Sequence, residues 1–399
     1  MQDIQNLFTA EGIQNPYPFY DNLRNHSPAI YMPDWNSVFV TGHPENAALL
    51  RDPRASVERL SLSAEDLRKP EFMPVNALYH MMLFRDPPNH TRLRSLVSQA
   101  FTPRVVAEMR GLIEELLDDI LDGVAAQDGM EVLQDLAGPL PVTVIVKMLG
   151  LNAEDASRFK RWSESIAVLL DGGVESQIMM PRIMQDVQDM NVYFRRVADD
   201  LRENPQPGLM TALAGAELEG DKLSSEELLS NAVLLLVAGH ETTTNLIASG
   251  LHALITHPEQ LADLRAHPEL MDGAVEELLR FVSPVQATSR VLKGEMEIAG
   301  QNVPAGTQIQ VMLAAANRDP RVFHDPHTLN LRRDASKHLA LAAGHHYCLG
   351  ASLARLEAKV VFEKLLERFS RFELQQQHLT YRPNFTLRGL TELRVRMKR

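Results

Sequence analysis

The sequence predicts a mainly α-helical protein with a small β portion. Apolar residues recur at helical spacing over much of the segment 88–282, and short β-like segments lie only before and after it. The chain also lacks the regular strand–helix–strand alternation of a parallel sheet. No linker and no change of composition divides it, so we expect a single domain over residues 1–399.

The helices are indicated by apolar stripes and by their end signals. The clearest stripe lies in 109–124, and it consists of Leu112, Ile113, Leu116, Leu117, Ile120 and Leu121. Similar patterns predict helices over 142–149, 153–170, 183–201 and 349–369. Ser224 and Glu227 have the spacing of a capping box and open the longest predicted helix, which ends at Thr256 before Pro258.

The β portion is predicted in short pieces. Residues 1–80 are rich in proline, which breaks long helices, and strands are expected at 29–31 and 37–41. A small β-hairpin region with a turn at 300–302 is expected between residues 295 and 313. Short strands at 385–387 and 393–395 complete the prediction.

Charge and cysteine content exclude several classes of function. The 52 acidic and 40 basic residues give a net charge of -12, which argues against nucleic acid as a partner. The single cysteine, Cys348, rules out an intrachain disulfide and a multi-cysteine zinc or iron–sulfur site within this chain. With no signal-peptide pattern and no apolar run of about 20 residues, we expect a cytoplasmic protein without a membrane partner.

The surroundings of Cys348 favour a thiolate ligand. Gly344 and Gly350 flank the cysteine and let the backbone approach a flat ligand closely. A helix that begins near Leu349 points its first N–H groups at the sulfur, which favours the thiolate over the thiol. His346 could donate to an anionic ligand. The alternative is an inert buried cysteine at the start of a helix.

Three other segments combine residues that suggest chemistry. The longest helix contains Glu241 and Thr242 within an apolar stretch, where an acid is costly unless it has a use; a helix kink with a chance polar cluster is the alternative. Glu277 and Arg280 are spaced as an i, i+3 ion pair, which is most often a surface pair. His90 could also share a helix face with the cation four residues later, and a solvated basic face is the alternative there.

These four segments, in the order in which they occur along the chain, resemble those of bacterial cytochromes P450. The loop has that family's Gly-x-His-x-Cys-x-Gly pattern and leads into a Leu-Ala-Arg-x-Glu helix. Two positions depart from it, because Leu341 replaces an aromatic residue and Ala342 replaces a glycine. The resemblance implies a P450-like fold with haem b (iron protoporphyrin IX) between the long central helix and the cysteine loop.

The resemblance also implies a role for each candidate residue. Cys348 would be the iron ligand, while Glu241 and Thr242 would be catalytic and relay protons to dioxygen. The remaining cofactor-binding residues would be Ala238, Gly350, His90 with Arg94 for one propionate, and Arg290 with His346 for the other. Glu277 and Arg280 would form an internal structural pair with a partner near 317–320.

The implied function is that of a haem-thiolate monooxygenase, since a thiolate ligand favours O–O cleavage. It would insert one oxygen atom of O2 into an apolar small molecule of the macrolide, terpenoid, steroid or fatty acid class. Its electrons would come from a separate ferredoxin or flavodoxin with its reductase. A peroxide-driven peroxygenase and a non-catalytic haem-binding partner of a biosynthetic assembly line remain alternatives, although the intact Glu241–Thr242 pair disfavours both.

Two surfaces follow from the same resemblance. Substrate would be contacted by the loop after Phe72, by residues 160–185, by Leu234 and Val237, and by 285–289. An acidic ferredoxin would dock on a basic patch that consists of Arg85, Arg92, Arg94, Arg104, Arg355 and Lys359.

Overall fold

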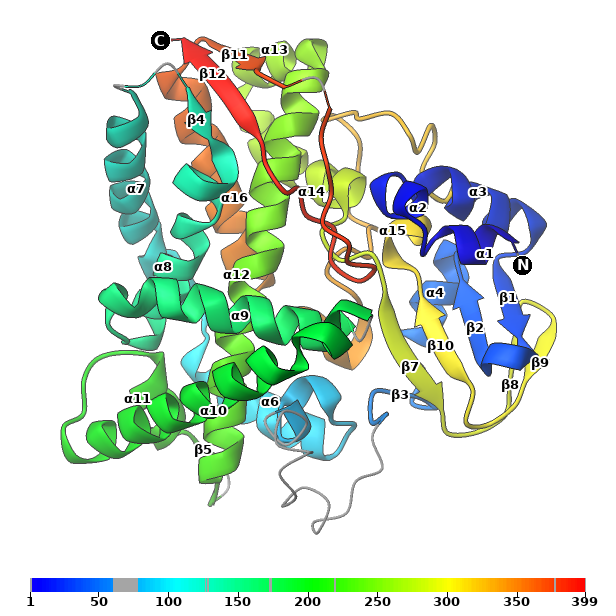
Figure 1. Ribbon diagram of the computed structural model, residues 1–399, viewed down its shortest axis with the longest axis horizontal. Coiled ribbons are helices and arrows are strands. Elements are labelled where there is room, and N and C mark those ends of the chain that lie inside the picture. Colours follow the sequence, from blue (N-terminus) through cyan, green and yellow to red (C-terminus); the bar gives the residue numbers. More distant parts are fainter. Residues whose placement is uncertain are drawn as a thin grey trace. The chain divides into compact units, whose positions relative to one another are not determined.

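A computed structural model describes residues 2–59, 78–125, 127, 129–171, 174–218, 220–376 and 378–398 (Figure 1). The predicted substrate loop after Phe72 lies outside these residues. The chain forms two compact units. The first unit comprises Met1–Ser56, Glu114–Gly138 and Thr242–Arg399, and the second comprises Val57–Ile113 and Pro139–Glu241.

A mixed five-stranded sheet forms one part of the first unit. Its strand order is β1-β2-β10-β7-β3, and its strands are β1 (Ala29–Met32), β2 (Ser37–Val40), β10 (Gln308–Val311), β7 (Thr288–Leu292) and β3 (Ala55–Ser56). β10 runs parallel to β2 and antiparallel to β7, so strands that are far apart in the sequence lie side by side (Figure 1). The sheet therefore ties the N-terminal segment to the part of the chain that carries Arg290.

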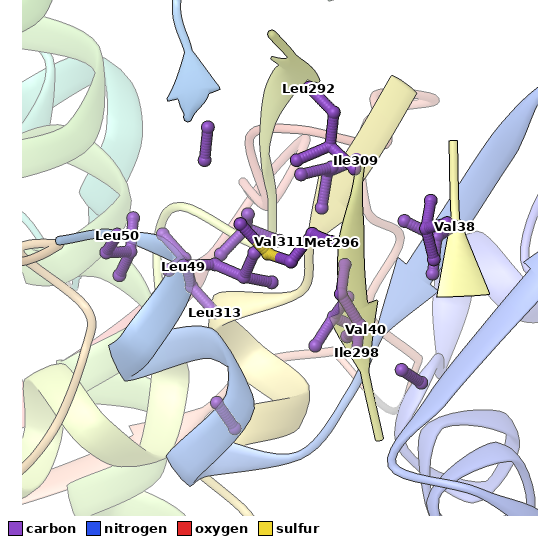
Figure 2. Close-up of a cluster of buried hydrophobic side chains, with 14 of the residues drawn as sticks. Val38, Val40, Leu49, Leu50, Leu292, Met296, Ile298, Ile309, Val311 and Leu313 are labelled. Carbon is purple, nitrogen blue, oxygen red and sulfur yellow. The ribbon is translucent and has the colours of Figure 1, made fainter. Parts of the chain in front are cut away.

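The core on this sheet extends to the cysteine loop. Alternate residues of the strands, among them Val38, Val40, Ile309 and Val311, pack together with Leu49 of helix α4 (His43–Leu49) (Figure 2). The same cluster contains residues 339 and 343, which precede the cysteine. Burial of these apolar side chains stabilises the sheet and fixes the start of the loop upon it.

Helices make up most of the rest of the first unit. They are α1 (Gln2–Asn6), α2 (Ala10–Gln14), α3 (Tyr17–His26), α13 (Pro258–Ala266), α14 (Met271–Val282), α15 (Leu313–Ala316) and α16 (Ala351–Arg368). A hairpin of β8 (Met296–Ile298) and β9 (Gln301–Val303) and a sheet of β11 (Arg371–Leu374), β12 (Arg394–Lys398) and β4 (Met130–Glu131) complete it. In α14 one face is buried and the acidic residues 276 and 277 follow each other.

Within its described residues, the second unit consists of helices and one small hairpin. Its complete helices are α6 (Asn89–Ala100), α8 (Pro139–Leu149), α9 (Ala156–Asp171), α10 (Val174–Glu203) and α11 (Leu209–Gly215), and the hairpin pairs β5 (Glu217–Leu218) with β6 (Asp221–Lys222). Helices α7 (Pro103–Ala125) and α12 (Ser225–Thr256) each contribute to both units.

The predicted capping box at the start of α12 is confirmed. The backbone N–H of Ser224 donates to Glu227 Oε2 at 2.9 Å, and the N–H of Glu227 donates to Ser224 Oγ at 3.1 Å. These two bonds satisfy donors that have no partner within the helix. The helix then continues to Thr256, as the sequence predicted.

The β predictions near residue 300 and near the C-terminus need correction. β8 pairs with β9 through a turn at Ala299 and Gly300, both with positive φ, whereas 308–311 joins the five-stranded sheet instead of this hairpin. The strand predicted at 385–387 is wrong, because only an isolated bridge from Leu387 to Val285 forms there. Sequence alternation indicates extended backbone but does not say which edge it pairs with.

Candidate active site

A tight loop at the N-terminal end of α16 carries Cys348. A single 3₁₀ turn over Gly344–His346 precedes it, and the N–H of Tyr347 donates to Gly344 O at 3.1 Å. The N–H of Cys348 then donates to Leu341 O at 3.0 Å, so the loop folds back on itself. Cys348 is the single cysteine of the sequence and is only partly buried by the protein. The residue is therefore not sealed within the hydrophobic core.

Two positive φ angles shape this loop. Gly344 has φ +70°, and a Cβ atom there would lie 2.3 Å from Leu50 O, so glycine is required. Ala342 has φ +58°, a left-handed conformation that is unfavourable for a residue with a Cβ atom. Glycine is the residue that the family pattern has at position 342, so its replacement by alanine leaves the backbone path in place at a cost in strain.

The middle of α12 has an open face. Residues 228–237 and 243–251 are buried, whereas Ala238 between them is exposed and Thr242 is half-buried. These two residues are four apart and share one side of the helix. Glu241 beside them is buried. An opening of this kind within a buried helix fits a bound group on that side.

The candidate propionate ligands fall on three elements. His90 and Arg94 lie four residues apart on α6 in the second unit, with His90 buried and Arg94 half-buried. Arg290 is buried on β7 of the first unit, and its Nη1 donates to Thr288 Oγ1 and Ser289 O, both at 2.9 Å. His346 is half-buried in the cysteine loop. Within the first unit, Arg290, His346 and the thiol of Cys348 have the chemistry to bind an anionic group and the iron of a haem.

Glu277 and Arg280 form a fully buried ion pair, not a surface pair. Both side chains have 0% exposure, and two hydrogen bonds of 2.7 and 2.8 Å join them. Arg280 Nη1 also donates to Asn317 O at 2.9 Å, which confirms the predicted contact near 317–320, and to Pro326 O at 2.8 Å. Arg333 and the N–H of Asn330 donate to Glu277. The pair thus joins α14 to the segment 317–333.

Sequence reasoning missed the neighbouring carboxylate, Glu276. Burial raises its pKa, but hydrogen bonds from Arg355 and His338 outweigh this effect and lower the pKa to about 2. A signal for this site was available in the two consecutive acids of the helix. Nothing in the sequence showed that Arg355 and His338 would meet one of them.

Ion pairs with acidic residues reduce the positive charge of the expected basic patch. Arg355 binds Glu276, and Lys359 donates to Asp272 at 2.6 Å. In the second unit Arg92 binds Asp221 and Glu227. These acidic partners offset the positive charge that the sequence predicted on this surface. A docking patch for an acidic ferredoxin therefore remains a prediction with less charge to support it.

Comparison with known proteins agrees with the resemblance. The family model described as cytochrome P450 matches residues 64–393. The chain is 39% identical to the biotin biosynthesis cytochrome P450 of Bacillus subtilis over 392 residues, which cover 97% of each chain. It is 42% identical to the cytochrome P450 monooxygenase PikC of Streptomyces venezuelae over 394 residues, which cover 96% of this chain and 92% of PikC.

A solved structure of similar fold covers almost the whole chain. It is a crystal structure of P450BioI in complex with acyl carrier protein ligated to hexadec-9Z-enoic acid, with a TM-score of 0.91 and 37% identity. The match covers 98% of this chain and 99% of that one. Among the described residues, no helix has the length and apolar character needed to cross a membrane.

Proposed function

Because the chain belongs to the cytochrome P450 family and is a haem-dependent monooxygenase, we propose that Cys348 is its iron ligand and that Glu241 and Thr242 supply protons for oxygen activation. The observation that carries the proposal is the partly buried Cys348 in a family-type loop. When bound, the haem supplies the chemistry that activates O2, with electron density from the thiolate.

The chain's own residues would prepare this reaction in three ways. Cys348 is placed before the first turn of α16, where helix N–H groups favour the thiolate. Glu241 is buried in α12 beside the half-buried Thr242, so a proton can be held next to the open face without bulk water. Arg290, His346, His90 and Arg94 would neutralise the two propionates.

The proposed substrate is an apolar small molecule, of the macrolide, terpenoid, steroid or fatty acid class. Leu234 and Val237 are buried on α12 before its open face, and Met179 and Met180 are half-buried on α10. Structures of similar fold contain testosterone, myristic acid or a carrier-bound hexadecenoic acid, according to their descriptions. Electrons would come from a ferredoxin or flavodoxin and its reductase.

The iron ligand is tested by replacing the sulfur. The Cys348→Ser variant should lose the thiolate-type spectrum of the reduced carbon monoxide complex, while a haem-loaded wild-type sample shows it. A variant that keeps this spectrum would contradict the assignment of Cys348.

The proton role is tested with Thr242→Ala. We expect product formed per electron consumed to fall by about tenfold or more, with the electrons recovered as peroxide. Thr243→Ala is the matched control, because Thr243 is the next residue of α12 but is buried. Unchanged coupling in Thr242→Ala would contradict the role, and peroxide-driven turnover equal to donor-driven turnover would favour the peroxygenase alternative.

A further inference from the structure

Glu276 on α14 is linked, directly or through one arginine, to both ends of the segment that leads to Cys348. One end is His338, and the other is Tyr347, which Glu276 reaches through Arg355. We propose that Glu276 is a positioning residue that holds the cysteine loop, residues 338–347, closed, which means that both ends of the loop are fixed to helices α14 and α16. This inference rests on the proposed role of Cys348 as the iron ligand, but the closure of the loop can be measured independently.

Two hydrogen bonds fix the orientation of the His338 ring at the first end of the loop. The N–H of Ala340 donates to His338 Nδ1 at 3.1 Å, so in the neutral ring Nε2 carries the proton. His338 Nε2 then donates to Glu276 Oε2 at 3.1 Å. The His338 side chain is almost completely buried, which limits competition from water. This end is therefore tied to α14 by an oriented, charge-assisted bond.

The Tyr347 end is held through Arg355 of α16. Arg355 Nε donates to Glu276 Oε1 at 2.5 Å and Nη2 donates to Oε2 at 2.9 Å, which is a bidentate pair. The remaining Nη1 donates to Tyr347 OH at 3.1 Å. Once Glu276 orients the guanidinium plane, this third bond fixes the residue directly before Cys348.

The two halves of the loop differ in how much packing supports them. Leu339 and Ala343 are part of the core on the five-stranded sheet, so the first half is held by burial. Tyr347 is 39% exposed, and packing alone restrains its ring poorly. The bond from Arg355 therefore acts where the hydrophobic core has ended, next to the sulfur.

The experiment compares Glu276→Gln with a matched control, Asp263→Asn. Asp263 on α13 also accepts two hydrogen bonds from one arginine, Arg332, at 2.7 and 2.8 Å, and it contacts His267 Nδ1 at 3.0 Å. Its side chain is 26% exposed and that of Glu276 is 24% exposed. Both variants remove one charge from a similar site, but only Glu276 touches the cysteine loop.

The readouts are amide hydrogen exchange in the loop and the spectrum of the reduced carbon monoxide complex, both measured on the haem-loaded protein. In Glu276→Gln we expect amide exchange of Ala342 and Cys348 to be about tenfold faster, because a charge-assisted network is lost. We also expect a larger fraction of the protein to lack the thiolate-type spectrum. Asp263→Asn should match the wild type in both.

Two milder variants should give a smaller increase in exchange, and they keep the proposal testable if Glu276→Gln folds poorly. Tyr347→Phe removes only the hydroxyl, and Arg355→Lys keeps the charge but loses the bidentate geometry. Each should accelerate exchange near Cys348 by a few-fold. Equal exchange in Glu276→Gln and Asp263→Asn, or no change in Tyr347→Phe, would overturn the proposal. If Cys348→Ser kept the thiolate-type spectrum, the ligand assignment would fail while the exchange result still decided whether Glu276 closes the loop.

Discussion

Glu276 and Glu277 are consecutive on α14, yet they face different surroundings. Glu277 has 0% exposure and joins Arg280, Arg333 and the backbone of Asn330 inside the protein. Glu276 is 24% exposed and joins His338 and Arg355 at the edge of the cysteine loop. Successive residues of a helix point about 100° apart, so one helix can bind two segments with two neighbouring acids.

The difference teaches how burial changes what an ion pair does. Glu277 and Arg280 are both fully buried. If one of the two charges is removed, the other stays buried without its counter-ion and water cannot replace it. Around Glu276 water can replace part of a lost contact. We therefore expect the Glu277–Arg280 pair to contribute mainly to the free energy of unfolding. The contacts of Glu276 should mainly affect the local order of the cysteine loop.

The largest effect should follow removal of the buried charge. In Glu277→Gln, Arg280 keeps its backbone contacts to Asn317 and Pro326 but loses its counter-ion, so the free energy of unfolding should fall by about 3–5 kcal/mol. Urea unfolding of the haem-loaded protein measures this loss. A loss no larger than that of Glu276→Gln would show that burial does not separate the two sites.

The contrast marks what sequence could and could not predict. The i, i+3 spacing indicated the Glu277–Arg280 pair, and its contact with Asn317 was expected from the family resemblance. Glu276 was not predicted, because its partners lie 62 and 79 residues away in the chain. A local pattern reveals neighbours within a helix, whereas contacts between distant segments depend on packing.

The fold shows the same division. Helix α12 and its capping box at Ser224 follow from local periodicity and end signals. The predicted ends of α8, α9 and α16 lie within three residues of the observed ends, whereas α7 and α10 begin six and nine residues before their predicted starts. The pairing of β10 with β2 was not predicted, since these strands are about 270 residues apart in sequence. Cys348 could be singled out as the only cysteine with a family-type loop, but the strained backbone of Ala342 could be seen only in the structure.

A third acid, Glu357, sharpens the comparison because it is buried and none of the cations that the structure describes lowers its pKa. Burial raises the pKa of Glu357 on α16 from 4.5 to about 8. Between these values the unfolded chain ionises while the folded protein stays protonated, so the stability present at low pH is progressively lost as pH rises. At about pH 7 this loss amounts to about 3 kcal/mol relative to a residue that does not ionise.

Glu357→Gln should therefore gain stability over the wild type as pH rises. The difference in free energy of unfolding between variant and wild type should grow by about 4 kcal/mol from about pH 4.5 to about pH 8. If the amide also packs differently from the carboxyl group, this changes the free energy of unfolding of the variant by the same amount at every pH. The increase of the difference with pH is therefore unaffected. Parallel stability curves for the two proteins would contradict the raised pKa.

Glu276 should show the opposite dependence on pH with a smaller size. Its pKa is lowered from 4.5 to about 2, so its contribution is present above 4.5 and is lost as pH falls towards 2. Because the side chain is partly exposed, we expect only about 1 kcal/mol of stability to depend on it. The acid limb of urea unfolding should be shallower in Glu276→Gln than in the wild type, and an identical acid limb would exclude this linkage.

The smallest effect is expected at the exposed end of the series, the pair of Lys359 and Asp272. Asp272 also lies on α14, but its side chain is 79% exposed, so water screens the contact of 2.6 Å to Lys359. Asp272→Asn should change the free energy of unfolding by less than about 0.5 kcal/mol, and added salt should remove the difference.

The Asp272→Asn variant would also leave Lys359 without this acidic partner, so reduction by an acidic ferredoxin should become slightly faster at low salt. Slower reduction in Asp272→Asn would argue that an acidic donor does not dock over α14 and α16.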